Sequence, residues 1–461
     1  MKKIFDEVQS LDKRAVEKYF LSEDILMENA ALSIFNFIKK NFKKDKSVLI
    51  VCGGGNNGAD GLALARLLQN SYKVKVLQHI KAKSPMAKIQ EKRAKAIGVE
   101  FVTKLEKCDI LVDAIFGTGL NKDISFEAKT LLKEMNKLDA YKIACDIPSG
   151  INKDGLIKEI CFKANTTITM GAYKTSLFGD LVKDFVGKIK VANLGIHSDF
   201  FQTSSNKYLL SKSDLKLPNR ESKNSNKGSF GHLNIICGEK EGASIISSEA
   251  AFAFGVGLVT VIRKNKILTP SFLMQSKDFS KNCTAVAFGM GLGFIEDSLL
   301  DKIVALKLPK LLDADIFYNK KVLQFLDQDC VLTPHPKEFI SLLKLTNLAD
   351  ISIEELQKRR FFYVEKFTQK YPNVTLLLKG ANVIVAKNNN IFVNIFGSSK
   401  LSKGGSGDVL SGLIASLLAQ GYSSLDATIS GSLAHTLSAK RYKKRSYSMT
   451  PRDIIEGVKI L

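Results

Sequence analysis

Short apolar runs alternate with helix-like segments along this chain, and that alternation constrains its fold more than any other feature. The first expected strands are residues 47–52, 74–79, 110–114 and 142–146. Helices are expected before and between them at 12–42, 59–70, 86–97 and 125–138. Strands that alternate with helices at this spacing predict an α/β fold, in which helices cover both faces of a parallel sheet.

The alternation lapses between residues 198 and 227, where the stretch 218–227 is polar and rich in turn formers. A chain of 461 residues is also too long for one core. We therefore expect two domains, 1–205 and 206–461. Beyond the boundary, strands are expected at 233–237, 258–262, 285–289, 310–313, 330–332 and 375–379, followed by a hairpin at 383–395.

Composition narrows the class of protein. The opening residues turn acidic before an apolar segment forms, and no uncharged apolar run is long enough to cross a bilayer, so neither a secretory signal nor a membrane partner is expected. Seven scattered cysteines without a CxxC pair indicate reduced thiols in a cytoplasmic protein. The net charge of +22 is spread over both parts, which favours a solvated lysine-rich surface over nucleic-acid binding. Self-association as a homo-oligomer stays open.

The segment from Lys403 to Leu410 is a glycine run with one aspartate, Asp408, directly before an apolar stretch. Glycines let the backbone approach a ligand closely, and the N-terminus of the helix expected behind them attracts phosphate. The aspartate then stands where a substrate hydroxyl would meet a phosphoryl group. This pattern predicts a general base, Asp408, for phosphoryl transfer.

Three expected strand ends in the first domain carry glycine and aspartate. They are Cys52–Gly61 (CGGGNNGADG), Asp113–Leu120 (DAIFGTGL) and Asp146–Gly150 (DIPSG). Because the carboxyl ends of parallel strands lie at one edge of a sheet, these loops are expected to converge on one ligand site.

In sequence and order these strings resemble the N-terminal domain of the bacterial NAD(P)H-hydrate repair enzymes, the YjeF N-terminal family, over roughly residues 10–200. The resemblance implies a Rossmann-like three-layer domain that epimerises hydrated NAD(P)H. It implies Asp146 as the acid/base, with Lys174 near the pocket, and potassium ligated by Asn57, Asp113 and Ser149. The implied nucleotide contacts are Asn56, Asn57, Gly58, Ala59, Asp60, Gly117, Thr118, Gly119, Leu120, Asn121, Lys122, Asp123 and Asp146. Ala59 stands where the family has glycine.

Polar groups also follow the expected strands of the second domain. His335 lies between two prolines, Lys379 is followed by glycine, and Gly289, Gly291 and Gly293 end another strand. A histidine on a loop stiffened by proline is more plausibly a ligand contact than core filler.

Together with the glycine run, this order resembles the C-terminal dehydratase domain of the same family, a ribokinase-like fold, over about residues 206–461. The resemblance implies that Lys379, Gly380, Ala381, Asn382, Val383 and Gly407 hold the adenine nucleotide. It implies that Asp408, Ala243, Gly291 and His335 contact the hydrated nicotinamide. Met290, Lys337 and Ser406 depart from the residues usual in the family, and Glu239-Lys240-Glu241 replaces a small glycine- and serine-rich loop.

The chemistry implied by this resemblance is repair of NADH or NADPH that carries a hydroxyl at C6 of the ring. The second domain would phosphorylate that hydroxyl with ADP or ATP, magnesium being expected, and loss of phosphate would regenerate NAD(P)H. In bacterial members the donor is typically ADP, which gives AMP. The first domain would interconvert the R and S epimers, since the second uses only the S form.

Two other classes of function stay open on sequence alone. A small-molecule kinase, for a vitamin precursor or a sugar, shares the glycine run and would release a stable phosphorylated product. A non-catalytic nucleotide-binding module would keep its function when Asp408 is replaced by asparagine. The motifs of the first domain argue against the kinase, because simple kinases of this type lack that partner.

Overall fold

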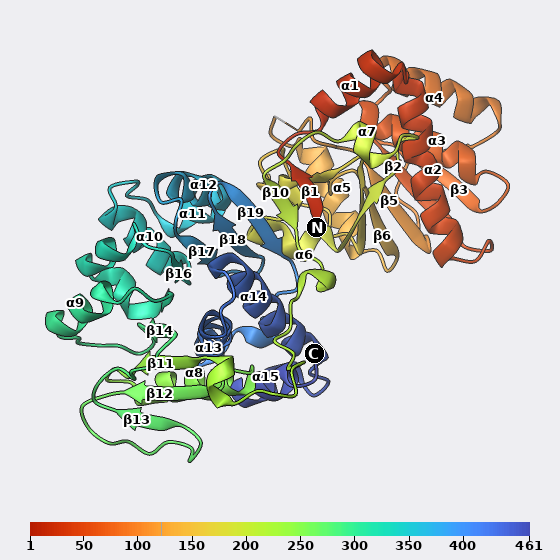
Figure 1. Cartoon of the computed structure of the whole chain (residues 1–461). Coiled ribbons are helices and arrows are strands. Elements are labelled where there is room, and N and C mark those ends of the chain that lie inside the picture. Colours follow the sequence, from red (N-terminus) through yellow and green to blue (C-terminus); the bar gives the residue numbers. More distant parts are fainter. Residues whose placement is uncertain (121) are drawn as a thin grey trace. The chain divides into compact units, whose positions relative to one another are not determined.

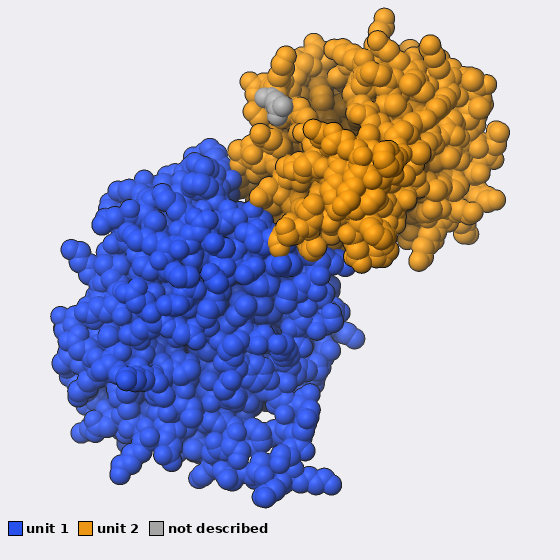
Figure 2. Space-filling model, turned by 45° about the horizontal axis from the view of Figure 1, so that its top comes forward, with its two compact units in different colours: residues 1–2, 206–461 blue, residues 3–205 orange. Residues whose placement is uncertain are grey.

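The computed structural model describes residues 1–120 and 122–461 (Figure 1). They form two compact units, shown in different colours in Figure 2. The N-terminal unit is Lys3–Ser205, and the C-terminal unit is Asn206–Leu461 together with Met1–Lys2. Each unit has its own main sheet and its own hydrophobic core.

The main sheet of the N-terminal unit has seven strands in the order β4-β3-β2-β5-β6-β7-β9, and all neighbouring pairs are parallel. The strands are β2 (Ser47–Cys52), β3 (Lys73–Gln78), β4 (Glu100–Val102), β5 (Ile110–Ala114), β6 (Tyr141–Cys145), β7 (Thr166–Met170) and β9 (Lys188–Ala192). A short parallel pair, β1 (Lys2–Phe5) and β8 (Tyr173–Lys174), lies outside this sheet.

Helices cover both faces of this sheet, because successive side chains of each strand point to opposite faces. Val48 and Ile50 pack with helices α2 and α3 on one face, whereas Leu49 and Val51 pack with α5 on the other. The helices of the unit are α1 (Gln9–Tyr19), α2 (Glu23–Asn41), α3 (Asn56–Leu68), α4 (Pro85–Ala96), α5 (Phe126–Lys137), α6 (Lys183–Val186) and α7 (Ser198–Phe201).

The single helix expected over 12–42 is wrong, since two helices occupy that range. The first ends at Phe20, which adopts a left-handed φ of 56°. The second begins after Ser22, whose side chain accepts a hydrogen bond from the backbone N–H of Ile25 and so caps the helix. The apolar periodicity continues through both helices, but the capping at Phe20 and Ser22 divides them.

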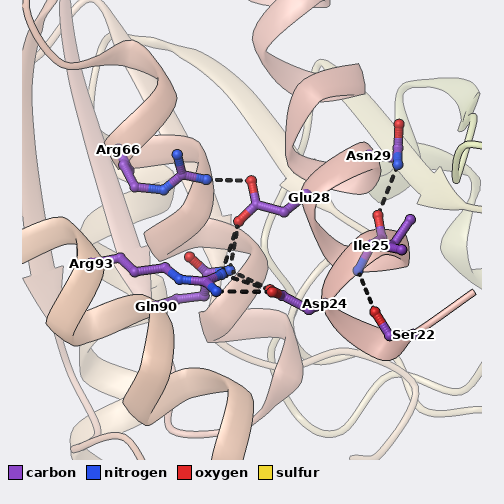
Figure 3. A network of polar contacts seen from close by, with 8 residues as sticks. All are labelled: Ser22, Asp24, Ile25, Glu28, Asn29, Arg66, Gln90 and Arg93. Atoms are coloured by element: carbon purple, nitrogen blue, oxygen red, sulfur yellow. Dashed lines mark hydrogen bonds and ion pairs between the residues drawn. The ribbon is translucent and has the colours of Figure 1, made fainter.

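A polar network holds α2, α3 and α4 together, as Figure 3 shows. Glu28 of α2 accepts from Arg66 of α3 and, at 2.9 Å, from Gln90 of α4. Arg93 of α4 donates to both oxygens of Asp24 at 2.6 and 2.9 Å. These contacts fix the three helices against each other, and α3 carries the glycine loop of the first candidate site at its start.

The strands from β10 to β19 in the C-terminal unit lie side by side in one sheet, in the order β13-β12-β11-β14-β15-β16-β17-β18-β19-β10. Its pairs are parallel except for β17–β18 and β18–β19, so the hairpin expected at 383–395 is confirmed. The strands are β10 (Lys207–Leu209), β11 (His232–Ile236), β12 (Leu258–Ile262), β13 (Met274–Ser276), β14 (Ala285–Phe288), β15 (Lys310–Leu312), β16 (Cys330–Leu332), β17 (Thr375–Leu378), β18 (Val383–Lys387) and β19 (Asn390–Asn394).

One face of this sheet packs against α8, α13 and α14, α15 packs against those three helices, and α12 contacts β17 and β18. Almost every residue of α13 is buried, because this helix lies between the sheet and its neighbours α8 and α14. The helices are α8 (Glu241–Ala253), α9 (Asp297–Ala305), α10 (Pro336–Leu345), α11 (Ile353–Lys358), α12 (Arg360–Lys370), α13 (Ser406–Ala419), α14 (Ser424–Arg441) and α15 (Pro451–Val458). Parallel sheets covered by helices in both units confirm the expected α/β class.

Within the described residues, no helix combines the length and the apolar character that crossing a membrane requires.

Candidate active sites

The first candidate site lies in the N-terminal unit, where the strand order of its sheet reverses. From β2, the sheet continues through β3 to β4 on one side and through β5 to β9 on the other, so the order reverses between β2 and β5. Cys52 pairs with Ala114, so the loops that follow β2 and β5 leave the sheet side by side. Ligands of open α/β sheets bind outside the carboxyl ends of the strands at such a reversal.

The glycine loop after β2 is packed so closely that side chains are excluded at Gly53, Gly54 and Gly58. A Cβ on Gly53 would lie 2.0 Å from the carbonyl oxygen of Ile115, and one on Gly58 would lie 1.9 Å from that of Gly53. The loop leads into α3, whose start at Gly55 and Asn56 has no side-chain cap. The free N–H groups and the positive end of the helix therefore favour an anionic ligand.

Asn57 stands out in this loop because both polar atoms of its side chain are buried and no described residue hydrogen-bonds to them. A Cβ on Gly117 would lie 3.5 Å from the Asn57 side chain and 3.5 Å from Oδ2 of Asp146. Asn57, Gly117 and Asp146, from three different loops, thus meet at one place. An unpaired buried amide at that place points to a ligand or an ion.

Asp113 and Ser149 form a buried pair beside these loops. Ser149 donates to the Asp113 carboxylate from its backbone N–H at 2.7 Å and from Oγ at 2.6 Å. Complete burial raises the pKa of Asp113 to about 6. Ser149 Oγ also accepts from the N–H of Phe116 at 2.9 Å, which links the loop after β5 to the loop after β6.

Asp146 is held in an unusual backbone conformation, with a φ of 67°, directly after β6. Its Oδ1 accepts from Nζ of Lys174 at 2.5 Å and from Oγ1 of Thr169 at 3.2 Å. Lys174 is 1% exposed. A strained, buried acid paired with a buried base is the kind of arrangement that clusters at active sites.

Two further carboxylates belong to this cluster. Asp60 on α3 is buried, and its pKa lies well above the usual range because of that burial and the nearby charges of Asp146 and Asp12. Asp12 on α1 has a pKa raised to about 6, chiefly by burial, while Lys174 lowers it. The sequence motifs indicated Asp60 but gave no signal for Asp12, which lies on a helix that carries no motif.

The other residues expected to contact the nucleotide lie in the same loops with varied exposure. Asn56 is exposed, Leu120 is buried, and a Cβ on Gly119 would meet nothing within 4 Å. The methyl group of Ala59 packs with Met27 of α2 and with Met86 and Ala87 of α4. Thr118 is half-buried, Lys122 and Asp123 are exposed, and Asn121 lies outside the described residues.

The second candidate site is at the corresponding edge of the C-terminal sheet, which reverses its order between β11 and β14. Gly291 follows β14 with a φ of 59°, and a Cβ there would lie 3.0 Å from that of Ala243 at the start of α8. Ser247 of α8 donates from Oγ to the carbonyl oxygen of Asp408 at 2.9 Å. The structure thus brings Ala243, Gly291 and the start of α13 together.

The glycine run forms the start of α13. Gly405 has a φ of 86° and precedes the helix without a side-chain cap, and a Cβ on Gly404 would meet nothing within 4 Å. Ser406, the first helical residue, lies 3.1 Å through Oγ from Nε2 of the buried His435 of α14. Asp408 has a pKa raised to about 6, because burial and Asp313 disfavour its charge more than Lys379 favours it.

Lys379 joins this helix start from the end of β17. A Cβ on Gly407 would lie 3.5 Å from its Nζ, which places the ammonium group beside the glycine run. The same Nζ donates to Oδ1 of Asp313 at 2.6 Å. A cation and an uncapped helix start, facing one space, are suited to bind phosphate.

The turn after Lys379 is supported by Arg360 of α12, a residue that carried no sequence signal. Its guanidinium donates to the carbonyl oxygens of Lys379 at 3.0 Å and of Asn382 at 3.2 Å. Gly380 and Ala381 of this turn are exposed, whereas Asn382 and Val383 are buried. The backbone of the turn is thereby fixed while its tip stays open to a ligand.

His335 has a structural role that the sequence did not indicate. Its Nδ1 accepts from the N–H of Glu338 at 3.1 Å and caps α10, and the Glu338 carboxylate accepts in return from the N–H of His335 at 2.7 Å. The imidazole is 45% exposed. Burial raises the pKa of Glu338, while the nearby charge of Lys379 opposes that rise and connects this loop to the same site.

Comparison with known proteins finds a family match in each of the two parts of the chain. Residues 23–176 match a family described as YjeF-related protein N-terminus, and residues 233–459 match one described as NAD(P)H-hydrate dehydratase. The chain is 43% identical, over all of both sequences, to the Bifunctional NAD(P)H-hydrate repair enzyme Nnr of Helicobacter pylori. The chain belongs to the bifunctional NAD(P)H-hydrate repair enzyme family.

Another member of this family, from Dictyoglomus turgidum, is 32% identical over 98% of this chain and 96% of its own length. Among solved structures, the ADP/ATP-dependent NAD(P)H-hydrate dehydratase from Bacillus subtilis, co-crystallised with ATP/Mg²⁺, aligns with a TM-score of 0.46. Its sequence identity is 21%, and the alignment covers 55% of this chain and 97% of that chain.

Proposed function

We propose that this chain repairs hydrated NADH and NADPH in two steps. Residues 1–205 interconvert the R and S epimers, and residues 206–461 convert the S epimer to NAD(P)H at the expense of ADP or ATP. The observation that carries the proposal is the position of Asp408 in the first turn of α13, a helix start that has no side-chain cap and has Lys379 beside it. The full-length identity to a repair enzyme gives independent support.

In the dehydratase step, Asp408 accepts the proton of the C6 hydroxyl as the hydroxyl oxygen attacks the terminal phosphorus of the nucleotide. With ADP, the bond from that phosphorus to the bridging oxygen breaks and AMP leaves. The N–H groups at the start of α13 and the Lys379 ammonium stabilise the charge on the transferring phosphoryl group. Phosphate then leaves C6, assisted by the lone pair of the ring nitrogen, and loss of the C5 proton regenerates the reduced ring.

Magnesium is the usual companion of a nucleotide, since it neutralises phosphate charge during transfer. Among the described residues, no three side chains of His, Cys, Asp or Glu come together as a metal site. The oxygens of Asp313 already accept from Lys379 and Ser411. The described side chains therefore do not form a magnesium site of their own.

In the epimerase step, Asp146 and Lys174 take the proton from the C6 hydroxyl and deliver one to the ring nitrogen as the bond between C6 and that nitrogen breaks, which leaves an aldehyde at C6. Rotation about the C5–C6 bond and the reverse steps close the ring with the other configuration at C6. Burial of both side chains keeps their geometry fixed while the substrate rearranges. The potassium set expected from the family fits the residues present. Asn57 offers an unpaired buried amide oxygen, and the buried Asp113 and Ser149 add hard oxygen atoms. Potassium would hold the anionic substrate between these loops.

We also propose that the protein works in the cytoplasm, where its coenzyme substrates are used. Support comes from the seven cysteines, all of which carry free thiols. Self-association stays a prediction.

The test incubates the purified full chain with a mixture of R and S hydrates and either ADP or ATP, and follows reduced-nicotinamide absorbance. The proposal expects full recovery of both epimers, together with AMP or ADP and inorganic phosphate. A stable phosphorylated hydrate without recovery of NAD(P)H would identify a kinase instead. Absence of any nucleotide consumption would contradict both the repair function and the kinase function.

A further inference from the structure

Asp313, directly after β15, is the most completely paired carboxylate near the glycine run. Its side chain is 2% exposed. Oδ1 accepts from Nζ of Lys379 at 2.6 Å, and Oδ2 accepts from Oγ of Ser411 at 2.6 Å. One carboxylate thus joins the end of β17 to the first turns of α13.

The two partners of Asp313 belong to the two elements that form the proposed phosphate site, the end of β17 and α13. The Lys379 ammonium is beside Gly407, and Ser411 is on α13 one turn after Asp408. The backbone at Asp313 is itself fixed, since a Cβ on Gly289 would lie 1.8 Å from the Asp313 carbonyl oxygen. Asp313 therefore couples Lys379 to α13 without needing to touch the nucleotide itself.

We infer that Asp313 is a positioning residue of the dehydratase site, which aims the Lys379 ammonium at the transferring phosphate and keeps it from pairing with Asp408. This inference rests on the proposed function. Without the Asp313 carboxylate, Asp408 and Glu338 are the carboxylates whose charges still interact with that of Lys379. A base paired with that ammonium would be a poorer proton acceptor, and the phosphate would lose its cation.

This role of Asp313 should be visible in the pH dependence of the reaction. Asp313 raises and Lys379 lowers the pKa of Asp408, so removing the Asp313 charge shifts that pKa downward by both routes. The other titratable groups around Lys379 are Glu338 and His335 at the start of α10, and His435 on α14, and their identities do not change in the test.

The experiment compares Asp313→Asn with Ser411→Ala in the full chain, using the S hydrate and ADP. For Asp313→Asn we expect kcat to fall by about 100-fold, because a misaimed group costs roughly that much, and ADP to bind more weakly. The acidic limb of kcat/KM should move to lower pH. Ser411→Ala removes one hydrogen bond to Asp313 but leaves the charge of Asp313. The acidic limb of kcat/KM for this variant should therefore stay at the wild-type pH.

A double variant, Asp313→Asn with Lys379→Gln, separates positioning from folding. If Asp313 acts through Lys379, the double variant is no slower than Lys379→Gln alone. The double variant also removes both charges of the pair, so it replaces the single variant if Asp313→Asn fails to fold. Additive losses in the double variant, or an unmoved acidic limb in Asp313→Asn, would overturn the inference. Should wild-type protein not recover NADH, the proposed function fails by itself. ADP affinity by calorimetry then still tests Asp313, because unchanged affinity in Asp313→Asn would overturn its role.

Discussion

Lys174 donates to Asp146 at 2.5 Å, and the two side chains are only 2% and 13% exposed. Asp146 holds this contact from a backbone with a φ of 67°, which few residues other than glycine, asparagine and aspartate adopt. The two residues proposed as acid and base of the epimerase site are thus positioned by the fold itself. Because little solvent reaches them, removal of either partner leaves an uncompensated buried charge.

Replacing Asp146 with asparagine should abolish most epimerase activity and spare the dehydratase. Asparagine tolerates the left-handed backbone, so the loop is kept while the proton acceptor is lost. We expect R-to-S interconversion to slow by roughly 10²- to 10⁴-fold, the usual contribution of a general acid/base. Chromatographic separation of the epimers measures that rate.

The matched control is Asp139→Asn, which changes an exposed aspartate of the same unit. Both variants should dehydrate the pure S hydrate at the wild-type rate. If Asp146→Asn slows the use of both epimers equally, the assignment of epimerisation to this site is wrong.

Asp408 should give the dehydratase reaction its acidic limb. With a pKa raised to about 6, the carboxylate is protonated below that pH and ionised above it. Since only the ionised form accepts a proton, kcat/KM should fall about tenfold for each pH unit below this value and level off above it. Rates measured across the acidic and neutral pH range with saturating ADP check this, and a limb centred near the ordinary aspartate pKa would contradict it.

The proposed binding of potassium by Asn57 can be tested through the stability of the protein, without an activity assay. In the absence of the ion, its buried amide has no partner among the described residues, a situation that costs about 1–3 kcal/mol. Asn57→Ala should therefore be at least as stable as wild type in sodium buffer. Wild type should gain melting temperature when potassium replaces sodium, and the variant should not. Equal gains in both proteins would show that Asn57 does not ligate the ion.

Gly412 tests the packing that holds α13 against α8. A Cβ there would lie 2.2 Å from the carbonyl oxygen of Ser247, the residue that also donates to Asp408. We expect Gly412→Ala to destabilise the protein by about 1–3 kcal/mol, as overpacking does. Gly242→Ala is the control, because a Cβ on Gly242 meets nothing within 4 Å. Denaturant unfolding followed by circular dichroism measures both, and equal stabilities would refute the packing argument.

The strands and their loops were predictable because both features are local in the sequence. Apolar runs and the glycines that follow them are enough to place Asn57, Asp113 and Asp146 at one edge of a sheet. Helix ends were less predictable. The sequence between 353 and 370 predicts a single helix, but the structure has two, α11 and α12, because Arg359 leaves helical geometry with a ψ of 38°.

The contacts that support the sites escaped prediction because the two partners are far apart in the sequence. Arg360 contacts the carbonyl oxygen of Asn382, 22 residues later, and Asp313 contacts Ser411, 98 residues later. Nothing near Asp12 marks it as a neighbour of Asp146. Long-range side-chain pairs become visible only when the fold brings their elements together.

The most direct test of the account is the stoichiometry of repair of the pure S hydrate by wild type and Asp408→Asn. Wild type should form one AMP and one phosphate for each NADH regenerated from ADP. Asp408→Asn should bind ADP with unchanged affinity and be slower by roughly 10²- to 10⁴-fold in forming all three products. NADH recovery that proceeds without AMP, or at the wild-type rate in Asp408→Asn, would contradict the central role of this carboxylate.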